Sequence, residues 1–426
     1  MKIFRDPIHN VIDLNTGDKN IDKLIIKLID SKEFQRLRFI RQLGFSYLAY
    51  PSATHTRFEH SLGTAFLAKR FLDKIISMEN TILATAHYND QFKEMLSDFF
   101  MQIKIDKPLT IVAALLHDIG HGPLSHVTEE VITGIKHEDW VRQIILGKTD
   151  VNKLLANCNQ SYPQIICDML IGTNTDRPSA KILAGQLDVD RIDYLLRDSH
   201  MTGSGYGKFD VEWLINVLTV GFVKNEKTGK SQVEIGLDYG KGLSVAEDFV
   251  MARTYMFKNV YLHKTTLIAQ NMLSLLFERI KELPSEDTKE SLHKIIFDNC
   301  KNTEELLDDY LNISDIDLYY FLKSLQSSAD EVVKNLSYKI LNRQLFKKIN
   351  NPTAVKELMI KEKGEDIAKY YITHVVTKKK TLNIHPKDDV LLFDKSGISR
   401  GISEYFNIQS HEDGYDLGYY VDQEVL

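Results

Sequence analysis

The sequence is poor in cysteine. It contains three, Cys158, Cys167 and Cys300, in 426 residues, and no two of them form a Cys-x-x-Cys pair. An odd number without paired spacing argues against a disulfide framework and against a thiolate zinc site. Cysteine usage therefore favours a reducing compartment, and we expect a cytoplasmic protein.

Long apolar runs are also missing. The longest, Ile111–Leu116, is far shorter than the roughly 20 residues that a membrane-spanning helix needs. The first seven residues include charged side chains and lack the apolar segment of a signal peptide. We therefore expect no membrane partner.

Excess positive charge is the third absence. The formal net charge is −6 and the pI about 6.2, whereas proteins that bind DNA or RNA usually present a net basic face to the phosphates. We therefore do not expect a nucleic-acid partner. The 43% of hydrophobic and 26% of charged residues are ordinary for a globular chain, whose length suggests two or three structural units.

Helical periodicity dominates the chain. Apolar residues recur at helical spacing from Asn20 to Leu43, with a break at Asp30-Ser31. Thr110 is expected to cap a helix that ends near Ile119, where glycines follow. Further helices are predicted over residues 58–77, 92–103, 180–198, 245–281 and much of 288–350.

Two stretches have a β pattern instead. Residues 219–223 and 233–237 flank a Glu-Lys-Thr-Gly turn and predict a β-hairpin. Short β-prone runs near 370–373 and 390–393 make the C-terminal part a mixed α+β region. We expect a mainly α fold, with Leu283–Asp287 as the most plausible linker.

The chemistry-bearing residues gather around His117-Asp118. His121 and His126 follow within the same ten residues, beside Gly120 and Gly122. Imidazole and carboxylate together suit Zn, Fe, Ni or Mn, and carboxylate also accepts Mg. A metal of this kind activates water, and the remaining histidines can transfer protons. Taken alone, the His-Asp pair is better explained as a core histidine beside a solvated acid, and the further histidines shift the interpretation toward a metal site.

A second acidic segment runs from Asp188 to Asp198. On a helix Asp190, Asp193 and Tyr194 share one face, as do Arg191, Tyr194 and Asp198. An amphipathic helix with ion pairs at i,i+4 spacing is the alternative interpretation. A face with a ligand, a cation, an aromatic ring and an acid suits a nucleotide.

In order and spacing, these motifs resemble those of the HD-domain deoxynucleoside triphosphate triphosphohydrolases, both bacterial and the vertebrate form with a sterile alpha motif. The resemblance rests on Arg57–Ser61, His117–His126 and Asp188–Tyr194. It extends from Phe4–His9 through Phe34–Arg38 and Gln42 to about Lys264. No sterile alpha motif is visible in the sequence.

The resemblance implies a helical HD core over residues 1–280 and a C-terminal oligomerisation or regulatory region over 281–426. One divalent metal ion (Mn, Fe, Zn, Ni or Mg) would be held by His60, His117, Asp118 and Asp190. The reaction would convert a dNTP into deoxynucleoside and inorganic triphosphate. The chain would assemble into a homo-oligomer, a dimer or tetramer, because the family's activator sites lie between subunits.

The same resemblance implies roles for single residues. His126 would be the general acid, with His121 and His137 along the phosphates. Bidentate guanidinium groups match phosphate oxygens, and Tyr194 against the sugar would exclude a ribose hydroxyl. The implied substrate contacts are Arg57, Arg191 and Arg253 to triphosphate, Tyr194 to sugar, Gln42 and Asp198 to the 3′ hydroxyl, Tyr261 near the base, and Leu43.

An activator site for GTP or dGTP is implied by Asp30, Gln35, Arg38 and Lys241, which match the family's pattern. The alternative is that Asp30 caps a helix and Arg38 forms a surface ion pair. Arg5, Trp213 and Tyr239 depart from the family at neighbouring activator positions.

Two other functions use the same metal core. An HD phosphodiesterase or nucleotidase would act on another nucleotide, and a catalytically inactive nucleotide sensor would keep the fold without turnover. The three arginines favour a longer phosphate chain over the first of these, and the intact core positions argue against the second.

Overall fold

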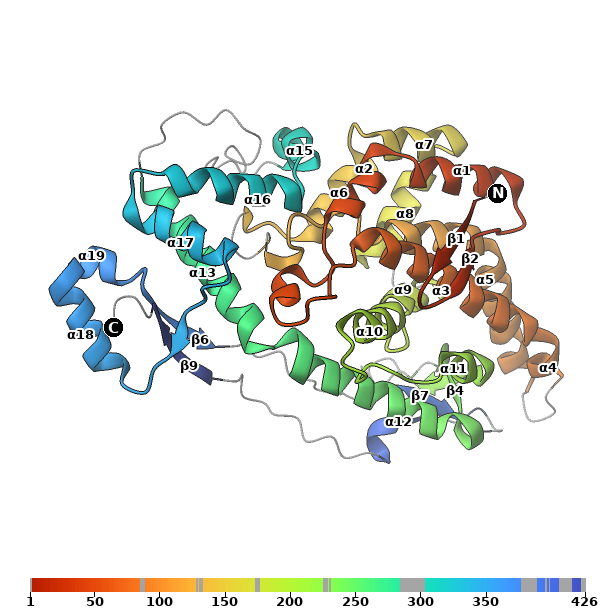
Figure 1. The fold of residues 1–426 in the computed structure, drawn as a ribbon. Coiled ribbons are helices and arrows are strands. Elements are labelled where there is room, and N and C mark those ends of the chain that lie inside the picture. Colours follow the sequence, from red (N-terminus) through yellow and green to blue (C-terminus); the bar gives the residue numbers. More distant parts are fainter. Residues whose placement is uncertain are drawn as a thin grey trace.

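The computed structural model describes residues 2–84, 89–127, 129, 133–172, 177–224, 229, 231–283, 303–376, 389–394, 397, 399–405 and 416–422. The fold is mainly helical with small sheets, as predicted (Figure 1). The chain begins with β1 Ile3–Asp6, β2 Asn10–Asp13, α1 Lys19–Ile29, α2 Lys32–Gln35, η1 Arg36–Phe39 and η2 Gly44–Leu48.

The predicted break at Asp30-Ser31 is present. Ser31 caps α2, its side chain accepting the amide of Phe34, while Asp30 follows the last turn of α1. Asp30 is therefore a C-cap and not an N-cap, because the apolar face of α1 is already complete at Ile29.

Two long helices form the centre of the molecule: α3 Arg57–Ser77 and α5 Asp90–Leu116. The prediction of separate helices at 92–103 and 110–119 was wrong, since α5 continues through Pro108 and ends at Leu116. Thr110 does not cap; its hydroxyl donates to the Asp106 carbonyl at 3.0 Å. Proline inside a helix costs about 3 kcal/mol, and burial of every residue from Leu109 to Leu116 offsets that cost.

The remaining N-terminal helices surround this pair. The contacts of α10 with α3 place its acidic face beside the start of α3. The helices are α4 Glu79–Leu83, α6 His137–Leu146, α7 Asp150–Cys158, α8 Tyr162–Ile171, α9 Ala180–Ala184, α10 Val189–Thr202, α11 Val211–Asn216, α12 Tyr239–Met256, the π-helical η4 Phe257–Tyr261 and α13 Lys264–Glu282.

The predicted hairpin is confirmed as β3 Leu218–Lys224 and β4 Ser231–Asp238, which pair antiparallel. Residues 225–228 of its turn lie outside the described residues. β7 Leu391–Phe393 adds parallel to β4, and β8 Ser399–Gly401 pairs with β7. Strands from beyond residue 281 therefore extend a sheet of the N-terminal part. The predicted domain boundary between residues 280 and 281 stays a prediction.

The C-terminal part is α+β, as predicted. Its sheet has the order β5-β9-β6, and α13 runs from the main helical body toward this sheet (Figure 1). The predicted linker residues 284–287 lie outside the described residues. The elements are α15 Thr303–Leu311, α16 Asp315–Ser324, η5 Leu325–Ser327, α17 Glu331–Leu341, β5 Lys347–Lys348, α18 Pro352–Lys363, α19 Glu365–Ala368, β6 Ile372–Val376, η7 Ile402–Glu404 and β9 Asp416–Val421.

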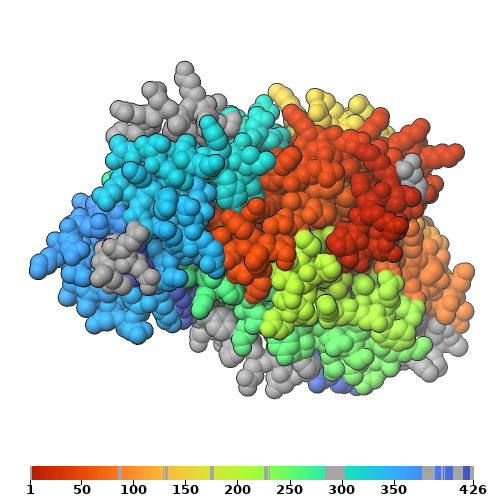
Figure 2. Space-filling model, in the orientation of Figure 1, coloured from red at the N-terminus to blue at the C-terminus, as the bar shows by residue number. Residues whose placement is uncertain are grey.

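The C-terminal helices pack directly on the N-terminal part. Figure 2 shows the cyan residues after 303 against the orange-red residues of the first 60. Arg36 donates to the Ile313 carbonyl at 3.1 Å, and the hydroxyls of Tyr319 and Tyr47 bond at 2.8 Å. Helices after residue 303 therefore pack against segments of the N-terminal part that the resemblance includes, such as residues 34–38.

Candidate metal and nucleotide site

The structure brings the four predicted metal ligands together. His60 starts from the first turn of α3, His117 and Asp118 follow the end of α5, and Asp190 opens α10. His60 Nε2 lies 3.2 Å from His117 Nε2 and 2.9 Å from Asp190 Oδ1. His117 Nε2 lies 3.4 Å from oxygens of both Asp118 and Asp190. This spacing of ligand atoms suits a single small cation bound by two nitrogens and two carboxylates.

Hydrogen bonds fix which nitrogen of each histidine faces the site. His117 Nδ1 donates to the Ala114 carbonyl at 2.8 Å, and His60 Nδ1 donates to Asp193 Oδ2 at 2.7 Å. Each Nδ1 is thus used in a hydrogen bond, which leaves Nε2 as the atom of each ring that can ligate a metal once it carries no proton. The residues present thus fit a divalent ion on the chemistry of their donor atoms.

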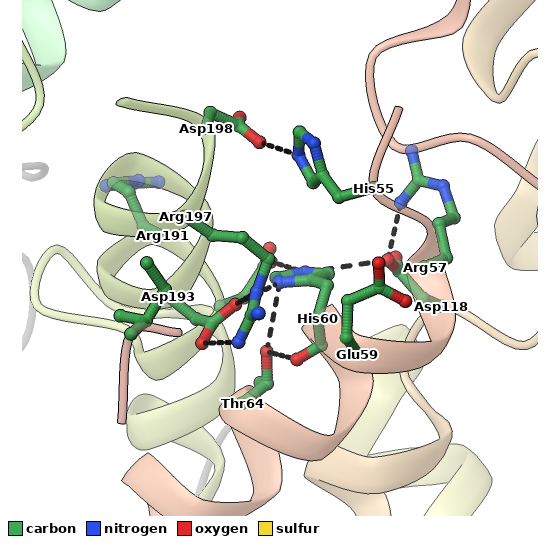
Figure 3. Close-up of polar contacts among 12 residues, drawn as sticks. His55, Arg57, Glu59, His60, Thr64, Asp118, Arg191, Asp193, Arg197 and Asp198 are labelled. Atoms are coloured by element: carbon green, nitrogen blue, oxygen red, sulfur yellow. Dashed lines mark hydrogen bonds and ion pairs between the residues drawn. The ribbon is translucent and has the colours of Figure 1, made fainter. Parts of the chain in front are cut away.

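A buried polar chain stands behind His60. Arg197 donates to both oxygens of Asp193 at 2.8 and 3.0 Å and to Asp6 at 2.7 Å. His9 Nε2 reaches Asp193 Oδ1 at 2.6 Å. Figure 3 shows His60 with Asp193 and Arg197 on one side and Asp118 and Arg57 on the other. The Asp-Pro-Ile-His segment near the N-terminus thereby supports the orientation of His60, a predicted metal ligand.

The local electrostatics favour a positive charge between the ligands. Burial lowers the pKa of His60, but the hydrogen bonds that its ring donates to Asp190 and Asp193 outweigh burial and raise that pKa to about 10. Burial raises the pKa of Asp190, yet its bonds to His117 and His60 hold it well below its usual range. Asp118 stays ionised in the same way, its pKa lowered against burial by Arg57 and His117. The ionised carboxylates of Asp118 and Asp190 would therefore stabilise a divalent cation bound between them.

Three further histidines gather around one acid. His121 Nδ1, His126 Nδ1 and His137 Nδ1 lie 3.3, 3.1 and 3.0 Å from Glu129 Oε1. Burial raises the pKa of Glu129, and the three imidazoles outweigh burial and hold it below its usual value. Burial and the nearby Arg57 lower the pKa of His121 to about 3, which leaves its ring neutral.

Two cavities meet at this point. One of about 340 Å³ is lined by the metal residues other than His60 and by His121, His126 and His137. The other, of about 590 Å³, is lined by Leu43, Asp198, Arg253, Tyr261 and neighbouring residues. Both are lined by Gln42, Arg57, His126 and Tyr194. These shared residues therefore lie where the cavity at the predicted metal ligands joins the larger cavity.

Hydrogen bonds hold the polar groups of the larger cavity in place. Asp198 accepts from His55 Nε2 at 2.7 Å and from the Tyr261 hydroxyl at 2.8 Å. Gln42 Oε1 is buried and has no hydrogen-bond partner within the described part of the chain. Because Gln42 lines both cavities, a ligand bound there could complete the bonding of this acceptor.

Some predicted residues lie elsewhere. Arg191 lines neither cavity; it bonds to Gln186 at 3.3 Å and pairs with Asp188 at 3.3 Å. Gln35 donates to the Ile29 carbonyl and accepts from Arg38, whose guanidinium lies 3.5 Å from the Phe58 ring centroid. Lys241 lies in the first turn of α12, bonded to Asp238 through its amide. The activator site therefore stays a prediction.

Five residues that support the site were not predicted from the sequence. His55 and Arg197 carried no motif of their own, and Asp193 was noted on the helix face without a role. Glu129 stands three residues after His126, a spacing at which a helical turn brings acid and imidazole together. His9 was part of the resemblance, but only the fold shows that it meets Asp193.

The fold and the site define a metal-dependent phosphohydrolase. A model described as "HD domain" matches residues 57–198, and one described as "HD associated region" matches residues 231–370. An uncharacterised Bacillus subtilis protein, YwfO, is 32% identical over 87% of this chain and 78% of its own length. The chain belongs to the HD-domain family.

Two further comparisons concern proteins with a named activity. The chicken deoxynucleoside triphosphate triphosphohydrolase SAMHD1 is 28% identical over 82% of this chain, which spans 56% of that protein. A crystal structure of a phosphohydrolase from Bacteroides thetaiotaomicron superposes with a TM-score of 0.78 at 26% identity, covering 99% of each chain. In the part of the chain described here, no helix combines the length and apolarity that crossing a membrane requires.

Gly63 offers a test of how tightly the metal ligand is supported. A Cβ at this position of α3 would overlap the carboxylate of Asp193 and the guanidinium of Arg197. We expect Gly63→Ala to reduce the free energy of unfolding by about 1–3 kcal/mol, measured by chemical denaturation. Gly240→Ala is the control, because its Cβ would meet nothing closer than 3.5 Å. Equal stability of the two variants would contradict the packing.

Proposed function

We propose that the protein hydrolyses deoxynucleoside triphosphates to deoxynucleoside and inorganic triphosphate. The observation that carries the proposal is the joined pair of cavities, one at the metal ligands and one large enough for a nucleoside. Arg57, which lines both, and Arg253, in the larger, supply the charge that a triphosphate needs. The similarity to SAMHD1 proteins supports the same substrate class.

His60, His117, Asp118 and Asp190 would hold the divalent metal. When bound, this ion would act as a Lewis acid on a phosphate oxygen and make water a better nucleophile. Arg57 forms an ion pair with Asp118, and its Nε donates a hydrogen bond to the Ser125 hydroxyl at 2.7 Å. The guanidinium is thus fixed between the metal ligands and the phosphate path.

Proton transfer to the leaving oxygen is assigned to His126. Its side chain is 62% exposed, lines both cavities and pairs with Glu129. From this position a protonated imidazole can donate to the departing 5′ oxygen. His121 and His137 stand beside it, facing the phosphates.

Deoxyribose selection is assigned to Tyr194. Its ring lies between the two cavities, 6.0 Å from the Tyr261 ring in an edge-on arrangement. A rigid aromatic wall against C2′ leaves no room for a ribose hydroxyl. Gln42 and Asp198 would bind the 3′ hydroxyl, with Leu43 and Tyr261 enclosing the sugar and base.

The proposal includes three properties of the whole protein. It would work in the cytoplasm, assemble into a dimer or tetramer, and respond to GTP or dGTP at a site that includes Asp30, Gln35, Arg38 and Lys241. Size-exclusion chromatography with light scattering, with and without these nucleotides, measures the assembly.

Product analysis tests the activity. The purified, metal-loaded protein is incubated with each dNTP and each ribonucleotide, alone and with GTP or dGTP, and products are separated by ion-exchange chromatography. We expect deoxynucleoside and triphosphate from dNTPs, loss of both after chelation, and recovery with added Mn²⁺. A metal-loaded protein that releases neither product in any combination contradicts the proposal. Release of monophosphate or pyrophosphate indicates a different phosphohydrolase.

A further inference from the structure

Asp315 lies at the N-terminal end of α16, in the HD associated region, yet it contacts loops of the HD core. Its Oδ1 accepts the amide of Leu124 at 2.7 Å, and its Oδ2 accepts the amide of Arg41 at 3.1 Å. The residue is 5% exposed. One carboxylate from the C-terminal part therefore joins two loops that are more than 80 residues apart in sequence.

The first of these loops has an unfavourable backbone. Leu124 and Ser125 have φ angles of 54° and 59°, in the left-handed region that favours glycine. Each such residue costs about 1–3 kcal/mol and persists only where its surroundings impose it. His126, the assigned proton donor, is the next residue. The direction of its side chain therefore depends on contacts that hold this turn.

The second loop precedes Gln42, which lines both cavities. Ser125 Oγ donates to the Arg41 carbonyl at 2.7 Å and accepts from Arg57 Nε at 2.7 Å. Asp315 binds the amides of the two loops, and Ser125 connects them on the other side. Displacing the carboxylate would therefore shift His126 and Gln42 together.

Neighbours of Asp315 fix the preceding turn in the same way. The Tyr310 hydroxyl donates to the Gly120 carbonyl at 2.7 Å. Arg36 donates to the carbonyls of Ile313 and His121 at 3.1 and 2.8 Å. Residues 310–315 are thus linked by specific hydrogen bonds, one of them through Arg36, to the backbone of residues 120–124.

We propose that Asp315 is a positioning residue of the active site: its carboxylate fixes the Leu124 and Arg41 amides so that His126 meets the leaving oxygen. The inference rests on the proposed function for the role of His126. It makes the HD associated region a structural part of the catalytic site. Burial raises the pKa of Asp315 to about 6, against the bonds from Leu124 and Arg41, so at neutral pH both oxygens accept.

The test compares Asp315→Asn with Asp317→Asn. The asparagine at 315 keeps the shape but has one acceptor oxygen, and its NH₂ would face an amide N–H. Asp317 is the matched control, two residues further on α16, where it accepts the Ser314 amide at 2.8 Å and hydroxyl at 2.7 Å. Both substitutions weaken the start of α16, but only Asp315→Asn releases the loops that contain Leu124 and Arg41.

We expect kcat of Asp315→Asn to fall on the order of 10- to 100-fold, with KM and metal content within about twofold of wild type. Hydrogen exchange of the metal-loaded protein should speed up at Leu124 and Arg41 in this variant and stay unchanged there in Asp317→Asn. Asp317→Asn should keep wild-type kcat. Should Asp315→Asn fail to fold, Asp315→Glu, which keeps the charge but moves the carboxylate, is expected to show the same two changes to a smaller degree.

Two results would overturn the proposal. One is unchanged hydrogen exchange at Leu124 and Arg41 in a folded variant of Asp315. The other is an equal loss of kcat in that variant and in Asp317→Asn. The exchange measurement needs no substrate, so it separates this inference from the proposed function. Faster exchange with no dNTP turnover even in wild type leaves the loop attachment standing and removes the dNTPase assignment, and with it the role of Asp315 in that reaction.

Discussion

Replacing His126 with alanine is expected to lower turnover of dNTPs by about 10²- to 10⁴-fold, the usual contribution of a general acid. The imidazole pairs with Glu129 at the border of the two cavities and touches none of the metal ligands in the contacts described. The metal should therefore remain bound at wild-type stoichiometry. Rapid-quench kinetics and elemental analysis of the same sample measure both quantities.

His200→Ala is the matched control, since His200 is exposed at the end of α10. A leaving group that needs no proton gives a second control. An analogue with an acidic alcohol, such as a nitrophenyl triphosphate ester, should lose far less rate in His126→Ala than a dNTP does. Wild-type turnover in His126→Ala would remove this histidine from the reaction, and loss of metal would make it a ligand instead.

The four residues predicted to bind the metal could be singled out because their order in the sequence is a motif, and the structure brings their side chains together at helix ends. Glycines after His117-Asp118 predict the end of a buried helix, and the structure ends α5 at Leu116. The acidic face of α10 was predictable from periodicity alone. A sequence cannot show, however, that Asp193 on that face turns to His60 and not to solvent.

What the sequence did not reveal depends on contacts between distant segments. Asp6 and Arg197 are 191 positions apart, and Leu124 and Asp315 are equally far apart, so no local pattern joins either pair. The continuity of α5 through Pro108 was missed for a related reason. Local rules set a penalty on proline, while the burial that outweighs it is decided by packing on α3.

Neutralising Asp193 is expected to weaken metal binding by about 10- to 100-fold. The carboxylate orients His60, accepts two bonds from Arg197 and meets His9, all of them buried. Asp193→Asn keeps one acceptor oxygen and removes the charge that Arg197 faces. Breaking a buried ion pair costs about 3–5 kcal/mol, and the free energy of unfolding should fall by up to that amount because Asp6 still pairs with Arg197.

The two effects are measured separately. Titration of the metal-free protein with Co²⁺, followed by its visible absorption, gives the affinity and reports the ligand geometry around the ion. Denaturant unfolding of the metal-free protein gives the stability. Asp98→Asn, an exposed exchange on α5, should change neither quantity. A variant that loses stability but binds Co²⁺ with wild-type affinity and spectrum would show that Asp193 supports the fold without orienting His60.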